Sequence, residues 1–233
     1  QWCRLSFWFQ AYLWPKNPAI FNRPVNRDGL WAEYDAKLRC IFRANYAFGV
    51  PDGAWYCEYA NGQREQGQYR VGNKRGPWWT WDGSGARELA TYAGGQLDGP
   101  SAQWSTDGRK TMEASYKAGQ REGRFRYWYR TGQIQEECSF AKDQLEGPRT
   151  TWYASGQKQR QRTYANGQKQ GLDTSWYPDG RKAEECLYEG DRPDGLWRQW
   201  HANGRLKAEG NYEKGRRVGP WTTWHKTGTK TRE

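Results

Sequence analysis

The chain has only two histidines and five cysteines, so few side chains could act as a catalytic base or a soft metal ligand. His201 and His225 lie one repeat apart, where other repeats carry tyrosine. Neighbouring hairpins are about 10 Å apart, or two strand spacings, so the two imidazoles cannot share a metal ion. The sequence shows no nucleophile–base pair and no G-K-[ST] phosphate loop. We therefore expect no enzymatic activity, no metal and no cofactor.

The cysteines contain no C-x-x-C pair, which excludes a zinc ribbon or a dithiol redox motif. Cys138 and Cys186 hold equivalent positions two repeats apart, roughly 20 Å, whereas a disulfide needs Cα atoms within about 7 Å. We expect both to be reduced and buried. Cys40 and Cys57 fall in adjacent units and could form a disulfide in an exported protein. Cys3 could join instead, or link to a neighbouring chain.

The composition predicts short β units rather than one aliphatic core. Only 35% of residues are hydrophobic, yet there are 16 Trp, 15 Tyr and 28 Gly. Large rings can supply buried area in turn-rich β structure. The net charge of +11 suits an acidic partner, but it could equally keep the array soluble. Because basic residues alternate with Glu and Gln, we favour solubility.

One glycine recurs every 23 or 24 residues, and a second follows each by nine residues. The first series is Gly53, Gly76, Gly99, Gly123, Gly147, Gly171, Gly195 and Gly219, and the second is Gly62, Gly85, Gly108, Gly132, Gly156, Gly180, Gly204 and Gly228. Asn or Asp often precedes the second glycine, which predicts a tight hairpin with positive φ at both residues. A looser turn, ending at the first glycine, would join successive repeats. The chain should be nearly all β.

Aromatic residues occupy two columns of each repeat. Two residues after the first glycine come Trp55, Trp78, Phe125, Trp197 and Trp221, with Ser101, Arg149 and Asp173 as exceptions. Five residues after it come Trp81, Trp104, Trp128, Trp152, Trp176, Trp200 and Trp224. An odd separation puts the columns on opposite faces of a strand, so one should be buried and the other partly exposed. They could serve core packing, which we favour, or form a binding platform.

The second strand of each repeat ends in an aromatic residue, such as Tyr116 or Tyr188. Two residues earlier lies a small side chain in most repeats, and three residues earlier lies Glu or Gln. We expect the ring and the small residue to share the packed face, with the Glu column on a solvated face.

The chain divides into residues 1–52, an N-terminal cap or docking segment with one degenerate repeat near Asp28, and residues 53–233, about 7.5 repeats. Terminal repeats are often atypical because they cap an open end. The chain begins with Gln rather than Met, so either a leader has been removed or the sequence is a fragment. Removal of a leader would imply export, to the periplasm, cell surface or medium, which we favour over the cytoplasm. No segment has the 18–20 apolar residues of a membrane-spanning helix.

The segment from Gly195 to Gly215 reads G-L-W-R-Q-W-H-A-N-G-R-L-K-A-E-G-N-Y-E-K-G. This pattern resembles the MORN-repeat variant, and many bacterial proteins that carry it are labelled YwqK-family antitoxins. The resemblance covers residues 53–233 and implies an elongated, single-layer array of β-hairpins with a role in protein interaction.

We therefore expect a non-catalytic protein-interaction or scaffolding module, a subunit of a larger bacterial assembly. Its partners would bind residues 1–52 and the open C-terminal edge. One alternative is an antitoxin-like protein that neutralises a toxin by direct binding. Another is glycan or anionic-lipid binding through exposed Trp and basic side chains. We expect no sequence-specific binding of nucleic acid.

Overall fold

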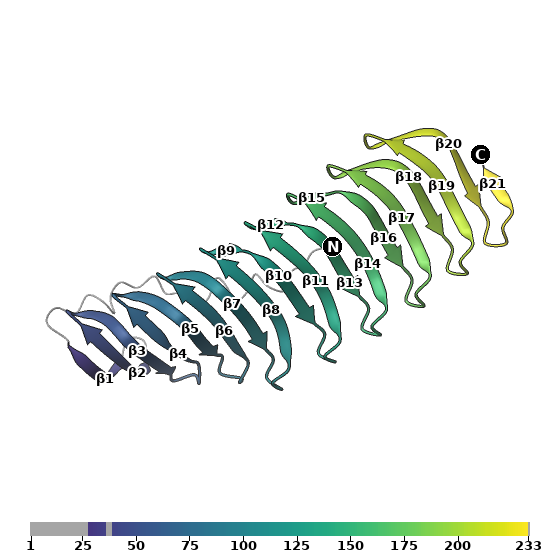
Figure 1. Cartoon of the computed structure of the whole chain (residues 1–233). Helices are drawn as coiled ribbons and strands as arrows, with labels where there is room; N and C mark the ends of the chain where they lie inside the picture. Colours follow the sequence, from purple (N-terminus) through teal and green to yellow (C-terminus); the bar gives the residue numbers. More distant parts are fainter. Residues whose placement is uncertain (1–27, 36–38, 233) are drawn as a thin grey trace.

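The computed structural model describes residues 28–35 and 39–232, and within them all regular structure is β-strand. The strands form one elongated sheet whose ribbons are strongly bowed (Figure 1). Successive strands pair antiparallel, as β2 with β3 and β19 with β20. The short strands β9, β12 and β15 directly precede β10, β13 and β16, and both members of each such pair are bonded to the same earlier strand, as β9 and β10 are to β8. The predicted all-β hairpin array is confirmed.

The strands run as follows: β1 (Gly29–Asp35), β2 (Cys40–Ala47), β3 (Val50–Tyr59), β4 (Arg64–Arg70), β5 (Asn73–Trp81), β6 (Arg87–Ala93), β7 (Gln96–Trp104), β8 (Lys110–Lys117), β9 (Gln120–Arg121), β10 (Gly123–Trp128), β11 (Ile134–Ala141), β12 (Gln144–Leu145), β13 (Gly147–Trp152), β14 (Lys158–Ala165), β15 (Gln168–Lys169), β16 (Gly171–Trp176), β17 (Lys182–Glu189), β18 (Arg192–Trp200), β19 (Leu206–Glu213), β20 (Arg216–Trp224) and β21 (Lys230–Arg232).

The degenerate repeat near Asp28 forms strands of the same sheet. β1 pairs with β2 along its whole length, and β2 continues into β3. The predicted boundary at residue 52 falls inside β3, where the pairing with β2 continues on both sides. Residues 1–27 of the predicted docking segment, with Cys3, lie outside the described residues. A capping or docking role for residues 1–52 stays a prediction.

The two turn types are the reverse of the prediction. At the second glycine the loop has three residues: Tyr129 N–H donates to Gln133 O, and Gly132 N–H donates to Tyr129 O. Here only glycine has a positive φ, 86° at Gly132, while the preceding Asn or Asp caps the loop through its side chain. This is a type I turn closed by a glycine bulge.

The turn between repeats is the tighter one. It has two residues, both with positive φ, such as Ala118 (48°) and Gly119 (81°), which is the type I′ geometry. The first glycine of each repeat is not part of it. Gly195, for example, lies within β18 with φ 105°, where the register to β17 shifts, so it forms a bulge in the strand.

The sheet has two different faces. The ring face carries the aromatic residue two positions after the first glycine, the terminal Tyr or Phe, and the small residue, because Trp78 pairs with Ala90 and Gly76 with Tyr92. The ladder face carries the Trp five positions after that glycine. The two Trp columns lie on opposite faces, as expected. Trp81 stacks on Trp79, and Trp79 directly follows the ring-face Trp78 in the strand, so Trp79 and Trp81 both lie on the ladder face.

The core lies on the ring face. Trp55, Trp78 and Phe125 are buried there, whereas Trp197 and Trp221 are half-buried. Several of these rings pack edge-on against the terminal aromatic residues, as Trp78 does at 5.0 Å from Tyr69 and Phe125 at 4.8 Å from Phe140. The small residue makes room for a ring of the next repeat. A Cβ on Gly67 would lie 2.1 Å from Trp78 Cε3, so this position admits no side chain without movement.

Candidate functional site

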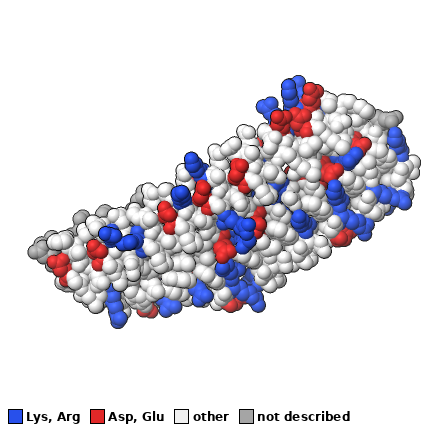
Figure 2. Space-filling view, viewed as in Figure 1, with Lys and Arg blue, Asp and Glu red and all other residues white. Residues whose placement is uncertain are grey.

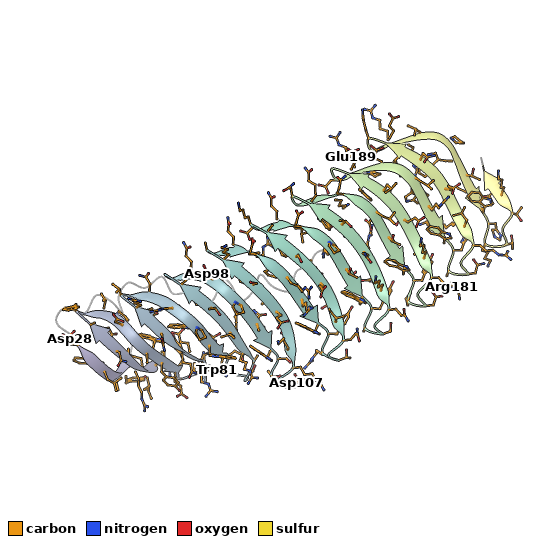
Figure 3. The ribbon with its side chains drawn as sticks, in the orientation of Figure 1. Asp28, Trp81, Asp98, Asp107, Arg181 and Glu189 are labelled. Carbon is orange, nitrogen blue, oxygen red and sulfur yellow. The ribbon has the colours of Figure 1, made fainter. Side chains whose placement is uncertain are left out.

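Seven tryptophans form a column along one long edge of the ladder face. Each is the last residue of the first strand of its repeat: Trp81, Trp104, Trp128, Trp152, Trp176, Trp200 and Trp224. All seven are half-buried. Figure 3 shows Trp81 on the same long edge as Asp107 and Arg181, opposite the edge of Asp28, Asp98 and Glu189. The column therefore runs beside the three-residue turns.

Cationic side chains lie over these rings. The guanidinium of Arg64 is 4.5 Å from the centre of Trp81, and that of Arg87 is 5.2 Å from Trp104. Lys110 Nζ lies 5.9 Å from both Trp104 and Trp128. Separations of this size are within the range of cation–π attraction. We call this alternation of Trp and Lys or Arg the Trp–cation ladder.

The Glu column of the ladder face is ion-paired rather than simply solvated, which corrects the prediction. Arg126 Nε donates to Glu137 at 2.7 Å, and Lys110 pairs with Glu113 at 2.8 Å. The same network recurs 72 residues later, where Arg198 meets Glu209 at 2.6 Å. Arg126 and Arg198 thus neutralise the Glu directly opposite on the next strand, whereas Lys110 pairs with Glu113 of its own strand β8.

The structure contains a hydrogen bond between repeats that the sequence did not predict. The hydroxyl of Tyr129 donates to Trp152 O at 2.7 Å, and Tyr153 and Tyr177 repeat this contact one unit further on. His201 Nε2 lies 2.9 Å from Trp224 O in the same arrangement. His201 thus takes the place of a tyrosine, as its position in the repeat indicated.

The described cysteines are buried. Cys138 and Cys186 fill the small-residue position on the ring face, opposite Phe125 and Asp173. Burial raises the pKa of the Cys186 thiol to about 11, so it is a poor nucleophile at neutral pH. Cys40 and Cys57 lie on neighbouring strands and carry thiols. A disulfide between them stays a prediction.

In the described residues, no group of three or more His, Cys, Asp and Glu side chains could hold a metal ion. The same part of the chain contains no helix long and apolar enough to cross a membrane. The eleven predicted tryptophans divide between the faces, with Trp55, Trp78, Trp197 and Trp221 on the ring face and the others in the ladder. The ladder tryptophans are all half-buried, whereas the ring-face column is buried at Trp55 and Trp78 but half-buried at Trp197 and Trp221.

Comparison with protein families finds the MORN repeat variant at residues 121–142, 145–166 and 193–214. Each matched segment spans one hairpin of the array, from the end of one type I′ turn to the next. A search of curated proteins gave no match. MORN repeats are generally modules for protein or membrane interaction. The chain is therefore a β-hairpin repeat protein that contains variant MORN repeats at these three segments.

Proposed function

We propose that this chain is a non-catalytic protein-binding module that docks a partner protein on its ladder face. The observation that supports this is the Trp–cation ladder, a periodic row of partly exposed Trp rings with Lys and Arg over them. Trp and Arg are the residues that most often dominate protein interfaces. A repeat array presents them over an extended surface.

The distribution of charge favours a protein over a polyanion. Figure 2 shows Lys and Arg interspersed with Asp and Glu over the face in view, without one continuous basic patch. Charges of both signs fit a partner surface of mixed charge, whereas a membrane or acidic glycan would favour clustered cations. Neutralising a toxin is one form that such protein binding could take.

Charge reversal on the ladder face tests the proposal. Arg124 is exposed on this face, next to the buried Phe125. In the native host, we expect Arg124→Glu to reduce co-purification of the partner about tenfold, because it places a negative charge where the proposed interface has a positive one. The matched change Lys226→Glu, in an exposed three-residue turn, should leave co-purification unchanged.

A photo-cross-linking amino acid at Leu172, which is 47% exposed on the ladder face, gives a second measurement. Cross-links to a protein from Leu172, but not from position 226, are expected. Flotation of the protein with anionic vesicles at physiological salt, together with no protein cross-link from Leu172, would contradict the proposal and favour lipid binding.

A further inference from the structure

The row of rings on the ring face is interrupted in two neighbouring repeats. Where five other repeats carry Trp or Phe and one carries Ser101, these repeats carry the charged residues Arg149 and Asp173. The small-residue position is altered in the same place, because Arg162 stands where other repeats have Gly, Ala or Cys. Arg160 lies on the same face, two residues earlier on β14. The register of β13, β14 and β16 brings all four together.

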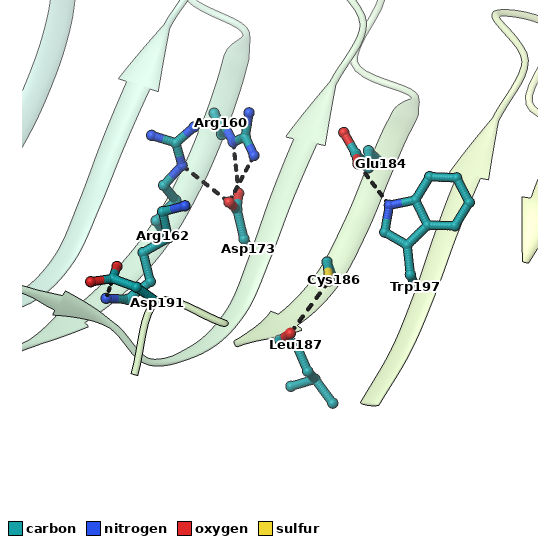
Figure 4. Close-up of polar contacts among 9 residues, drawn as sticks. Arg160, Arg162, Asp173, Glu184, Cys186, Leu187, Asp191 and Trp197 are labelled. Atoms are coloured by element: carbon teal, nitrogen blue, oxygen red, sulfur yellow. Dashed lines mark hydrogen bonds and ion pairs between the residues drawn. The ribbon is translucent and has the colours of Figure 1, made fainter. Parts of the chain in front are cut away.

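The arginines are held by two carboxylates. Asp173 is 4% exposed and accepts two hydrogen bonds from Arg160, both 2.7 Å, and one from Arg162 at 3.1 Å (Figure 4). Arg149 donates two hydrogen bonds to Glu136, at 2.8 and 3.1 Å. These pairs fix the three guanidinium planes while leaving other N–H groups of each arginine for further acceptors.

The arrangement contains an unfavourable contact. Arg149 and Arg162 are directly opposite each other on β13 and β14. Like charges in this relation destabilise a sheet. The carboxylate of Glu184 accepts a hydrogen bond from Trp197 Nε1 at 2.7 Å and also attracts Arg160, but no hydrogen bond joins it to Arg149 or Arg162 among the described contacts. A further anion beside the two guanidiniums would relieve their repulsion.

A cavity of about 390 Å³ opens at this place. Its lining includes Arg149, Arg160 and Arg162 together with the hydroxyl-bearing Thr151 and Ser175, and no carboxylate lines it. The carboxylates that hold the arginines thus stand behind them, and the cavity itself presents hydrogen-bond donors. Guanidinium groups bind carboxylate and phosphate through two parallel hydrogen bonds.

We propose that this cavity binds an oxyanion, a carboxylate or phosphate group, between Arg149, Arg160 and Arg162. Buried ion pairs contribute little net stability compared with packed hydrophobic residues. The neighbouring repeats show that a ring fits the position of Arg149 or Asp173. Core packing therefore does not explain why charged residues occupy these positions, whereas binding of an anionic ligand does. The three arginines lie on the face opposite the ladder, and the ladder residue Trp176 also lines the cavity.

Calorimetric titration tests the site with three probes at constant ionic strength: inorganic phosphate, glutarate and a short peptide with one glutamate. We expect at least one to bind the wild-type protein. Binding of a small anion identifies a free solute, and binding of the peptide alone identifies a side chain of a larger molecule. If none binds more tightly than chloride, the proposal is wrong.

Two variants test whether the anion binds in this cavity. Arg162→Ala restores the residue that Ala90 and Ala114 provide in other repeats, and it leaves Arg160 paired with Asp173. Loss of one charge-assisted contact should weaken binding tenfold or more. Ser175→Tyr fills the cavity with the residue that Tyr127 provides at the same position, and it should abolish binding while keeping every charge. Circular dichroism verifies that both variants fold.

The matched control is Arg126→Ala, which removes an arginine from the ladder face. It should bind the anion as the wild-type protein does. Equal binding by the wild-type protein, Arg162→Ala and Ser175→Tyr would place any bound anion elsewhere and overturn the assignment.

Discussion

At the scale of single residues, the side chain at the small-residue position determines how closely a ring of the next repeat can pack. Glycine occupies it at Gly67 and Gly210, where an indole of the next repeat lies directly over the backbone. Alanine or cysteine occupies it in other repeats, as Cys138 does opposite Phe125 and Cys186 does opposite Trp197. At Gly67 and Gly210 the close approach of the indole leaves no room for a Cβ.

Gly67→Ala should destabilise the protein by about 1–3 kcal/mol, the usual cost of forcing an extra carbon into a packed core. The added Cβ would lie 2.1 Å from Trp78 Cε3, so the ring must move. Urea unfolding measures the change. Gln68→Ala, at an exposed position on the same strand, should alter stability by less than about 0.5 kcal/mol. Equal effects of the two changes would contradict the close approach.

Glu88 gives a prediction for pH dependence. Burial raises the pKa of its carboxyl above the usual value, although a hydrogen bond with Gln103 partly opposes this. The folded protein therefore holds the proton more tightly than the unfolded chain. Ionisation costs stability above the raised pKa, and this cost disappears as the pH falls below the unfolded value.

We expect Glu88→Gln to be more stable than the wild-type protein at pH 7, with the difference shrinking towards pH 4. Unfolding midpoints measured across this range check the prediction. Glu213→Gln, at an exposed position, serves as the control. A difference between Glu88→Gln and wild type that is the same at every pH would exclude ionisation of Glu88 as its cause.

At the scale of elements, the hairpins are joined through their turns as well as their strands. An acidic or amide side chain near the start of one repeat accepts a hydrogen bond from the next type I′ turn, as Glu122 does from Lys142 N–H at 2.9 Å. Asp98 and Glu146 make the same contact with Ala118 and Asn166. The turns are thus tied together along one edge of the sheet.

The type I′ turn at Ala118 carries backbone strain, because alanine adopts φ 48° there. Ala118→Gly should stabilise the protein by about 0.5–1 kcal/mol, since a left-handed conformation costs a side-chain-bearing residue more than it costs glycine. Thermal unfolding measures the gain. Ala141→Gly, in strand β11, should have the opposite sign. If both substitutions destabilise the protein, the backbone at Ala118 is not strained.

At the scale of the whole molecule, each described strand is hydrogen-bonded to the strands beside it in one sheet, so stability is close to a sum of repeat terms. The rings of the ring face divide into buried clusters: one extends from Cys40 to Trp78 and another centres on Phe125. The charged residues Arg149 and Asp173 follow the second cluster. The stability that each repeat contributes should therefore vary along the array.

Removing one whole repeat tests this organisation. Deletion of residues 99–122 joins Asp98 to Gly123 and preserves the alternation of faces. The product should fold, with a lower melting temperature and a maximum dimension shorter by about 10 Å, two strand spacings, in solution scattering. Deletion of residues 99–110 removes half a repeat and should not give a folded array. A folded product from both deletions would contradict the repeat model.

Much of this protein follows from its sequence alone. The glycine period fixes hairpins of constant length, and the two-residue period of a strand fixes which Trp column shares a face with Tyr. Turn type was assigned wrongly, because Asn-Gly occurs both in a type I′ turn and in a loop closed by a glycine bulge. Only the loop length, which depends on strand register, separates the two.

The tertiary structure alone decided which charges meet. Asp173 binds Arg160 and Arg162 because β14 and β16 are paired in one register, and a shift of one residue would put these side chains on opposite faces. The position of Lys110 between two indoles depends on the same pairing. Spacing along the chain gives the face of each residue, but contacts across repeats depend on bulges and register that only the assembled sheet defines.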